Sequence, residues 1–148
     1  MNELYQSLAP GIREELSKYE EQTIVPAGRK LISEGVIPEH LIAIERGSVE
    51  ISVSAGNKPM SLSVAGKGKV LGLRSILINA PPEVEATTLE ECAIVRIPRD
   101  IFLNVLEEHP EIYFAVSKVL GADLNTAERF LRKFPRAARN LSIDSSTT

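Results

Sequence analysis

The hydrophobic and polar residues of this chain follow three successive patterns. Residues 7–19 place Ile12 and Leu16 four positions apart on one face, which is the spacing of an amphipathic helix. From residue 23 to residue 97 the apolar residues come in short, β-rich groups separated by glycine, proline and polar turns. After Pro98 the spacing of the apolar residues becomes helical again. The pattern therefore predicts a helix, a β-rich centre and further helices, in that order.

The β-rich centre contains segments with the length and composition of strands. They are residues 23–25, 30–33, 41–46, 49–54, 60–64, 84–89 and 93–97. Strands spaced this evenly are typical of a sandwich or a closed β-roll. The sequence therefore predicts an α+β fold that is mainly β: an antiparallel, double-stranded β-roll or jelly roll with an N-terminal helix and two C-terminal helices.

Two helices are expected after the β-rich centre. Asp100 is placed to cap a short helix, and Pro110 to open a longer one over residues 110–134. Apolar residues of the longer helix step by four and three, as in a coiled-coil seam. The seam consists of Leu120, Leu124, Ala127, Leu131 and Phe134. We expect a homodimer through this helix; the alternative is that the seam packs on its own chain.

The end of the chain has a different composition. Residues 135–148 are polar and finish in a run of serine and threonine, so we expect them to be disordered. The expected organisation is one domain over residues 1–134 and a disordered tail over residues 135–148.

Composition and charge narrow the classes of function. The 148 residues carry 17 Lys and Arg against 20 Asp and Glu, for a net charge of −3. Since no recognition-helix pattern follows the long helix either, we expect no specific DNA binding by this chain alone. No apolar run approaches the roughly 20 residues of a membrane span, so we expect no membrane contact. The N-terminus lacks a signal-peptide pattern and Cys92 is the single cysteine, which favours a cytoplasmic protein.

The residues needed for metal or nucleophilic chemistry are scarce. A metal enzyme on a cupin-like β-roll needs two or three histidines on adjoining strands, and His40 and His109 are the only histidines. No nucleophile motif of the G-x-S-x-G kind occurs. We therefore expect no catalytic residue, no metal and no enzyme activity, and the cupin-like metal enzyme is the less favoured alternative.

Several short motifs occur in a specific order along the chain. They are residues 25–28, 31–35 and 42–51, the glycines Gly68 and Gly72, and residues 92–102. Together with the order of helix, β-roll, short helix and long helix, these motifs resemble the sensor domain of the CRP/FNR regulators. The resemblance covers about residues 5–134. It implies a non-enzymatic regulatory module that resembles a cyclic nucleotide-binding domain.

The resemblance also identifies a nucleotide pocket whose charged residues are replaced. In the family, a glutamate that accepts hydrogen bonds from the ribose 2′-hydroxyl follows the second glycine, and here that position is Leu73. The family's arginine, which pairs with the cyclic phosphate, corresponds to Pro82, and Glu83 and Glu85 nearby would repel a phosphate. The vestigial pocket implied by the resemblance consists of Gly72, Leu73, Arg74, Ser75, Pro82 and Glu83.

Arg74 is the one cation left in this segment. It could take over contact with an anion, or it could be a surface arginine paired with an acid. Ser75 corresponds to the small residue whose backbone N–H reaches the phosphate in the family. The leading interpretation is a ligand-sensing regulatory module without a cofactor, which acts through a protein partner or through its own dimer. The alternative is a module that binds a cyclic nucleotide or another anionic effector through changed contacts.

Overall fold

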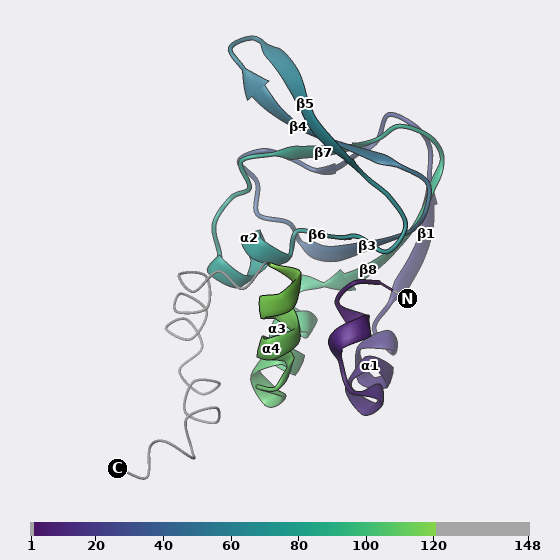
Figure 1. The fold of residues 1–148 in the computed structure, drawn as a ribbon, viewed down its shortest axis with the longest axis vertical. Coiled ribbons are helices and arrows are strands. Elements are labelled where there is room, and N and C mark those ends of the chain that lie inside the picture. The colour runs from purple at the N-terminus through teal and green to yellow at the C-terminus, as the bar shows by residue number, and fades with distance from the viewer. Residues whose placement is uncertain (1, 121–148) are drawn as a thin grey trace.

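The strands form two four-stranded antiparallel sheets that close into a β-roll (Figure 1). The computed structural model describes residues 2–120. The strands are β1 (Glu21–Val25), β2 (Lys30–Ile32), β3 (His40–Arg46), β4 (Val49–Ala55), β5 (Lys58–Ala65), β6 (Val70–Leu71), β7 (Glu85–Thr88) and β8 (Cys92–Pro98). The sheets have the strand orders β1-β8-β3-β6 and β2-β7-β4-β5.

Helices cover one face of the first sheet and one end of the roll. The 3₁₀ turn η1 (Tyr5–Ser7) and the helices α1 (Pro10–Ser17), α3 (Arg99–Glu108) and α4 (Ile112–Val119) lie together below that sheet in Figure 1. The short helix α2 (Leu73–Ile78) follows β6 and lies at the end of the roll. This arrangement confirms the predicted α+β fold, mainly β, with one N-terminal and two C-terminal helices.

Four expectations about the elements need correction, the first being that α1 covers Pro10–Ser17 instead of residues 7–19. All of the predicted strands are present with shifted ends, but β6 was missed because two residues show no alternation. The helix α3 starts at Arg99, and Asp100 lies inside its first turn without a side-chain capping hydrogen bond. The last described helix starts at Ile112 instead of Pro110. Of the predicted seam, Leu120 packs against the apolar cluster of its own chain, and the other four residues lie outside the described residues.

The central strands β3 and β8 of the sheet β1-β8-β3-β6 are buried on both faces, which explains why their apolar residues are nearly continuous. Leu41 and Ile97 are opposite each other in register and pack with the helices in one apolar cluster. Ile44 and Ile94 are also opposite each other but face the inside of the roll, in a second cluster. Alternate residues of one strand therefore support two cores, and this sheet joins the helices to the roll.

The corner between β3 and β4 requires glycine. Gly47 has φ 100°, and a Cβ atom there would lie 2.6 Å from the Sγ atom of Cys92. Cys92 is fully buried, as expected for a structural thiol.

Residues 2–120 contain no helix that is both long and apolar enough to cross a membrane.

Tyr5 ties the N-terminal turn to the segment that enters β1. Its ring is buried, and its hydroxyl donates a hydrogen bond of 2.7 Å to the Oε2 atom of Glu20. Burial raises the pKa of Tyr5 above its ordinary value, and the hydrogen bond to the carboxylate of Glu20 raises it further. The folded chain therefore holds this phenol in its neutral form.

We expect Tyr5 to make the folded state sensitive to alkali. Above the ordinary tyrosine pKa of about 10, the phenol ionises in the unfolded chain but not in the folded one. The free energy of unfolding should therefore fall as pH rises through that value, and Tyr5→Phe should remove this part of the fall. Denaturant unfolding on both sides of this pH measures it. Tyr19→Phe is the matched control, because Tyr19 is exposed and its replacement should leave the fall unchanged. The prediction would be contradicted if the free energy of unfolding fell equally with rising pH in Tyr5→Phe and in the unmutated chain.

Candidate functional site

A cavity of about 480 Å³ lies between α2, the loop after it and the sheet β2-β7-β4-β5. Its wall is mostly apolar, since nine of its thirteen lining residues are Ile, Leu, Val, Ala or Pro. The lining residues are Ile32, Ile51, Leu71, Gly72, Arg74, Ser75, Ile78, Ala80, Pro81, Pro82, Glu83, Val84 and Ala86. This volume is typical of a site for a small molecule, for which roughly 300–1,000 Å³ is usual.

Two residues with left-handed backbone fix the position of α2. Gly72 precedes the helix with φ 87°, and Asn79 ends it with φ 53°. A Cβ atom on Gly72 would lie 3.3 Å from the Cγ atom of Pro38, which is closer than most side-chain contacts. Only glycine allows this turn and lets the backbone at position 72 lie so close to the loop before β3. The helix α2 therefore begins at the edge of the cavity.

The two faces of α2 have different environments. Leu73, Ile76 and Leu77 follow helical spacing and are buried in the apolar cluster shared with α3 and α4. Arg74, Ser75 and Ile78 are on the other side and line the cavity. Of the six residues predicted from the resemblance, Gly72, Arg74, Ser75, Pro82 and Glu83 line this cavity. Leu73 is turned into the apolar core instead, where its exposure is 3%.

Arg74 is the main positive charge of the cavity. It is exposed, and it forms no hydrogen bond or ion pair with any side chain in the described part of the chain. The pairing with an acid that the sequence left open is therefore not observed among residues 2–120. Glu83, also exposed, lines the same cavity. Its negative charge disfavours the binding of an anion close to it.

Glu85 has a different role from the one suggested by the sequence. Its Oε1 atom is 3.2 Å from the Nζ atom of Lys30 across the β2–β7 pair. This ion pair offsets the charge of Glu85. Of the two acids expected to repel a phosphate, Glu83 is the one that faces the cavity.

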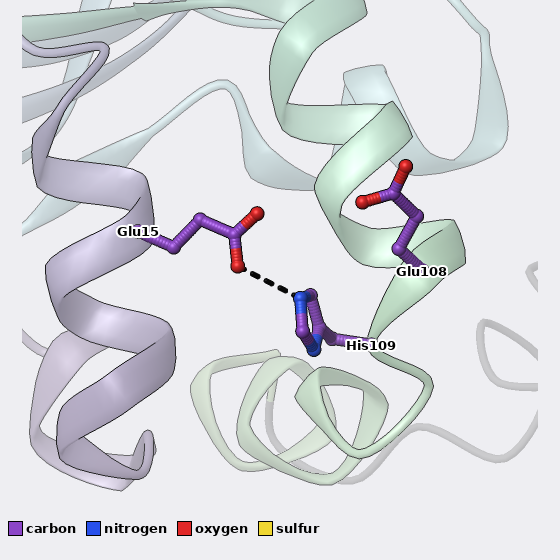
Figure 2. A group of neighbouring side chains, drawn as sticks. All are labelled: Glu15, Glu108 and His109. Carbon is purple, nitrogen blue, oxygen red and sulfur yellow. Dashed lines mark ion pairs between the residues drawn. The ribbon is translucent and has the colours of Figure 1, made fainter.

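A second group of polar side chains joins α1 to the junction of α3 and α4 (Figure 2). The potential metal-ligand atoms of Glu15, Glu108 and His109 all lie within 4.8 Å of one another. The Nε2 atom of His109 is 2.8 Å from Glu15, and its Nδ1 atom is 3.6 Å from Glu111. Both ring nitrogens thus face carboxylates of the protein, and the contact to Glu15 joins α1 to the junction of α3 and α4. Sequence spacing gave no signal for it because α1 and α3 lie at opposite ends of the domain's sequence.

His40, the other histidine, lies apart from this group. It begins β3, and its Nε2 atom is 3.5 Å from the Oε2 atom of Glu21. Each histidine therefore has its own acidic partner, and the two do not form a joint metal site of the cupin kind.

Comparison with known proteins identifies the domain. The family model of the cyclic nucleotide-binding domain matches residues 22–109. A CRP-like cAMP-activated global transcriptional regulator of Mycobacterium tuberculosis is 27% identical over 122 residues, which cover 82% of this chain and 54% of the regulator. The chain spans about half the length of the curated regulators that it matches.

Solved structures show the same fold. The catabolite activator protein of Thermus thermophilus matches with a TM-score of 0.72 at 20% identity, over 88% of this chain and 62% of that one. The regulatory domain of Toxoplasma gondii PKA, crystallised with cAMP, matches with a TM-score of 0.66 at 19% identity, over 78% of this chain and 54% of that one. Because the family model also matches more than half of the sequence, the chain belongs to the cyclic nucleotide-binding domain family.

Proposed function

We propose that this chain is a ligand-sensing regulatory module whose cavity binds a small apolar molecule with one negative charge, instead of a cyclic nucleotide. The observation that carries this proposal is an apolar cavity in which Arg74 has no partner among the described side chains. The apolar part of such a ligand would bury the apolar surface of the cavity wall, which favours binding. Its single anionic group would accept charge-assisted hydrogen bonds from the guanidinium of Arg74. The module itself has no catalytic role in this proposal.

The cavity is poorly suited to the polar groups of a cyclic nucleotide. A ribose hydroxyl needs an acceptor, and the residue at the family's acceptor position, Leu73, is buried in the core behind α2. A cyclic phosphate needs a cation, and Pro82 stands where the resemblance implies an arginine. Polar ligand groups buried without hydrogen-bond partners lower affinity, whereas an apolar ligand body carries no such penalty. Binding through Arg74 alone remains the alternative for a cyclic nucleotide.

The two-faced helix α2 supplies a route from ligand to output. Arg74 and Ser75 line the cavity, while Leu73 and Leu77 pack with α3 and α4. A ligand that draws α2 toward the cavity must disturb or tighten this packing, because close-packed cores transmit displacement. We propose that α4 takes a different position when the cavity is occupied than when it is empty.

The proposal places the module in the cytoplasm. The support is the one cysteine of the sequence, which is buried and free, as is usual in a reducing compartment. Fractionation of cells that produce the protein decides this point, and recovery outside the cytoplasm would contradict it.

We expect cyclic AMP and cyclic GMP to bind with dissociation constants no tighter than about 100 μM, because both charged anchors of the family are replaced. Calorimetry on the full chain measures this. Pro82→Arg should tighten binding by adding a cation to the cavity wall. Pro59→Arg, in the exposed strand β5, adds the same charge elsewhere and should have no effect. Micromolar binding to the unmutated chain would refute the proposed ligand preference.

We expect octanoate and phenylacetate to raise the midpoint of thermal unfolding, and octanol and 2-phenylethanol to raise it less. Arg74→Ala should weaken carboxylate binding by about ten-fold or more, since a charge-assisted hydrogen bond contributes about 1.5–3 kcal/mol. Glu83→Gln should tighten it by removing a like charge. Arg46→Ala is the control because Arg46 pairs with Glu91 away from the cavity. An affinity that Arg74→Ala leaves unchanged would exclude the assigned contact.

We further propose that the chain forms a homodimer through residues 110–134. The support is the four-three spacing of the apolar residues, most of which lie outside the described residues. Leu120 packs on its own chain, which favours the intramolecular alternative for that residue. Light scattering of the full chain should give the mass of a dimer, and Leu124→Lys should give a monomer that keeps the far-ultraviolet spectrum of the roll. A monomer for the unmutated chain at high micromolar concentration would end this proposal.

A further inference from the structure

A second cavity, of about 230 Å³, has three positively charged side chains in its wall, those of Arg29, Lys30 and Arg96. It lies between β1, β2, β3 and β8 and shares no lining residue with the cavity at α2. Its lining residues are Val25, Arg29, Lys30, Leu31, Pro38, Glu39, His40, Ile42, Ile94 and Arg96. Among them, Glu39 is the single acid, against two arginines, one lysine and one histidine.

Arg96 is the residue that requires an explanation. Its Nε atom is buried and has no hydrogen-bond partner within residues 2–120. Arg96 is two positions after Ile94 in β8, so it lies on the face of the strand that Ile94 buries inside the roll. A guanidinium has five donors and cannot lose its charge in a protein. A buried donor of this kind is normally satisfied by a carboxylate, a carbonyl, water or a bound anion.

The basic side chains of the cavity differ in whether an acid already contacts them. Lys30 contacts Glu85 at 3.2 Å, and His40 contacts Glu21 at 3.5 Å. Arg29 and Arg96 form no ion pair with a described residue. The two arginines therefore keep uncompensated charge at this cavity. Arg29 is exposed, at the turn between β1 and β2, whereas Arg96 lies deeper.

We propose that this cavity is a second ligand site, which binds a small oxyanion through Arg96. The planar guanidinium fits two oxygens of a carboxylate or a phosphate, and Arg29 adds a second positive charge. The volume is below the roughly 300–1,000 Å³ of sites for larger ligands, so the occupant is a small anion or the anionic end of a longer molecule. The carboxylate of Glu39 opposes the anion and favours a single charge over a double one.

The oxyanion site is independent of the ligand proposed for the α2 cavity. The bound anion would bridge β8 and the β1–β2 turn, because it would contact Arg96 in the strand and Arg29 in the turn. It would stabilise the folded chain, since ligands that bind only the folded state shift unfolding by mass action. Its effect is therefore measurable without any knowledge of the module's output.

Inorganic phosphate, sulfate, acetate and succinate are the probes, each compared with sodium chloride at the same ionic strength and on the full chain. At least one of these oxyanions should raise the thermal midpoint of the unmutated chain by a few degrees. Arg96→Met should abolish that increase. Arg46→Met should keep it, because Arg46 lies outside the cavity. The probe with the largest effect tells whether the site favours phosphate or carboxylate.

Two results would overturn the inference. One is an oxyanion effect that persists in Arg96→Met, which would be a general salt effect. The other is the absence of any oxyanion effect on the unmutated chain. Without oxyanions, Arg96→Met should be at least as stable as the unmutated chain, because it removes a buried Nε–H donor that has no partner among residues 2–120.

A direct readout covers the case in which Arg96→Met fails to fold. The Nε–H proton signal of Arg96 in the unmutated chain should shift on titration with the active probe and saturate. The shift should be smaller in Arg29→Ala. A signal that does not move would contradict the inference even where thermal midpoints change.

Discussion

The packing of Leu73, Ile76 and Leu77 beneath α2 is the interaction on which the candidate site depends. These side chains hold the helix against the apolar cluster of α3 and α4. Because the helix is anchored on this face, Arg74 and Ser75 on the other face are held at the cavity wall. The same packing removes Leu73 from the cavity wall, although the resemblance places this residue at the family's ribose contact. One helix thus sets both the shape of the cavity and its link to the C-terminal helices.

The two cavities treat charge in different ways. At the α2 cavity, Arg74 is exposed beside an apolar wall, and water solvates its guanidinium when no ligand is bound. Between the sheets, the Nε atom of Arg96 is buried and has no hydrogen-bond partner among residues 2–120, so this part of the chain retains an unsatisfied donor. Exposed charges cost little to leave unpaired, whereas buried ones are costly. The physical case for a bound anion is therefore stronger between the sheets, while the case for an apolar ligand is stronger at α2.

The sequence predicted most of the fold because strands and helices have different hydrophobic periods. Strand alternation and turn residues located every strand except β6, whose two residues carry no period. The start of the last described helix was predicted two residues early, since proline marks a helix boundary only approximately. For the site, the motif placed Gly72, Arg74 and Ser75 together, and the cavity contains all three. It could not show which face of the short helix each residue would occupy.

By itself, the sequence determined the order of the elements, the glycine corners and the residue types at the positions that the resemblance assigns to a nucleotide pocket. These properties are local, because they depend on side-chain chemistry and on neighbours along the chain. The tertiary structure decided which residues meet across the chain. It turned Leu73 into the core, paired Glu85 with Lys30 and joined Glu15 to His109. It also left the Nε atom of Arg96 without a hydrogen-bond partner in the part of the chain that the structure describes. Such contacts depend on strand register and helix orientation, which distant segments fix together and which no local pattern contains.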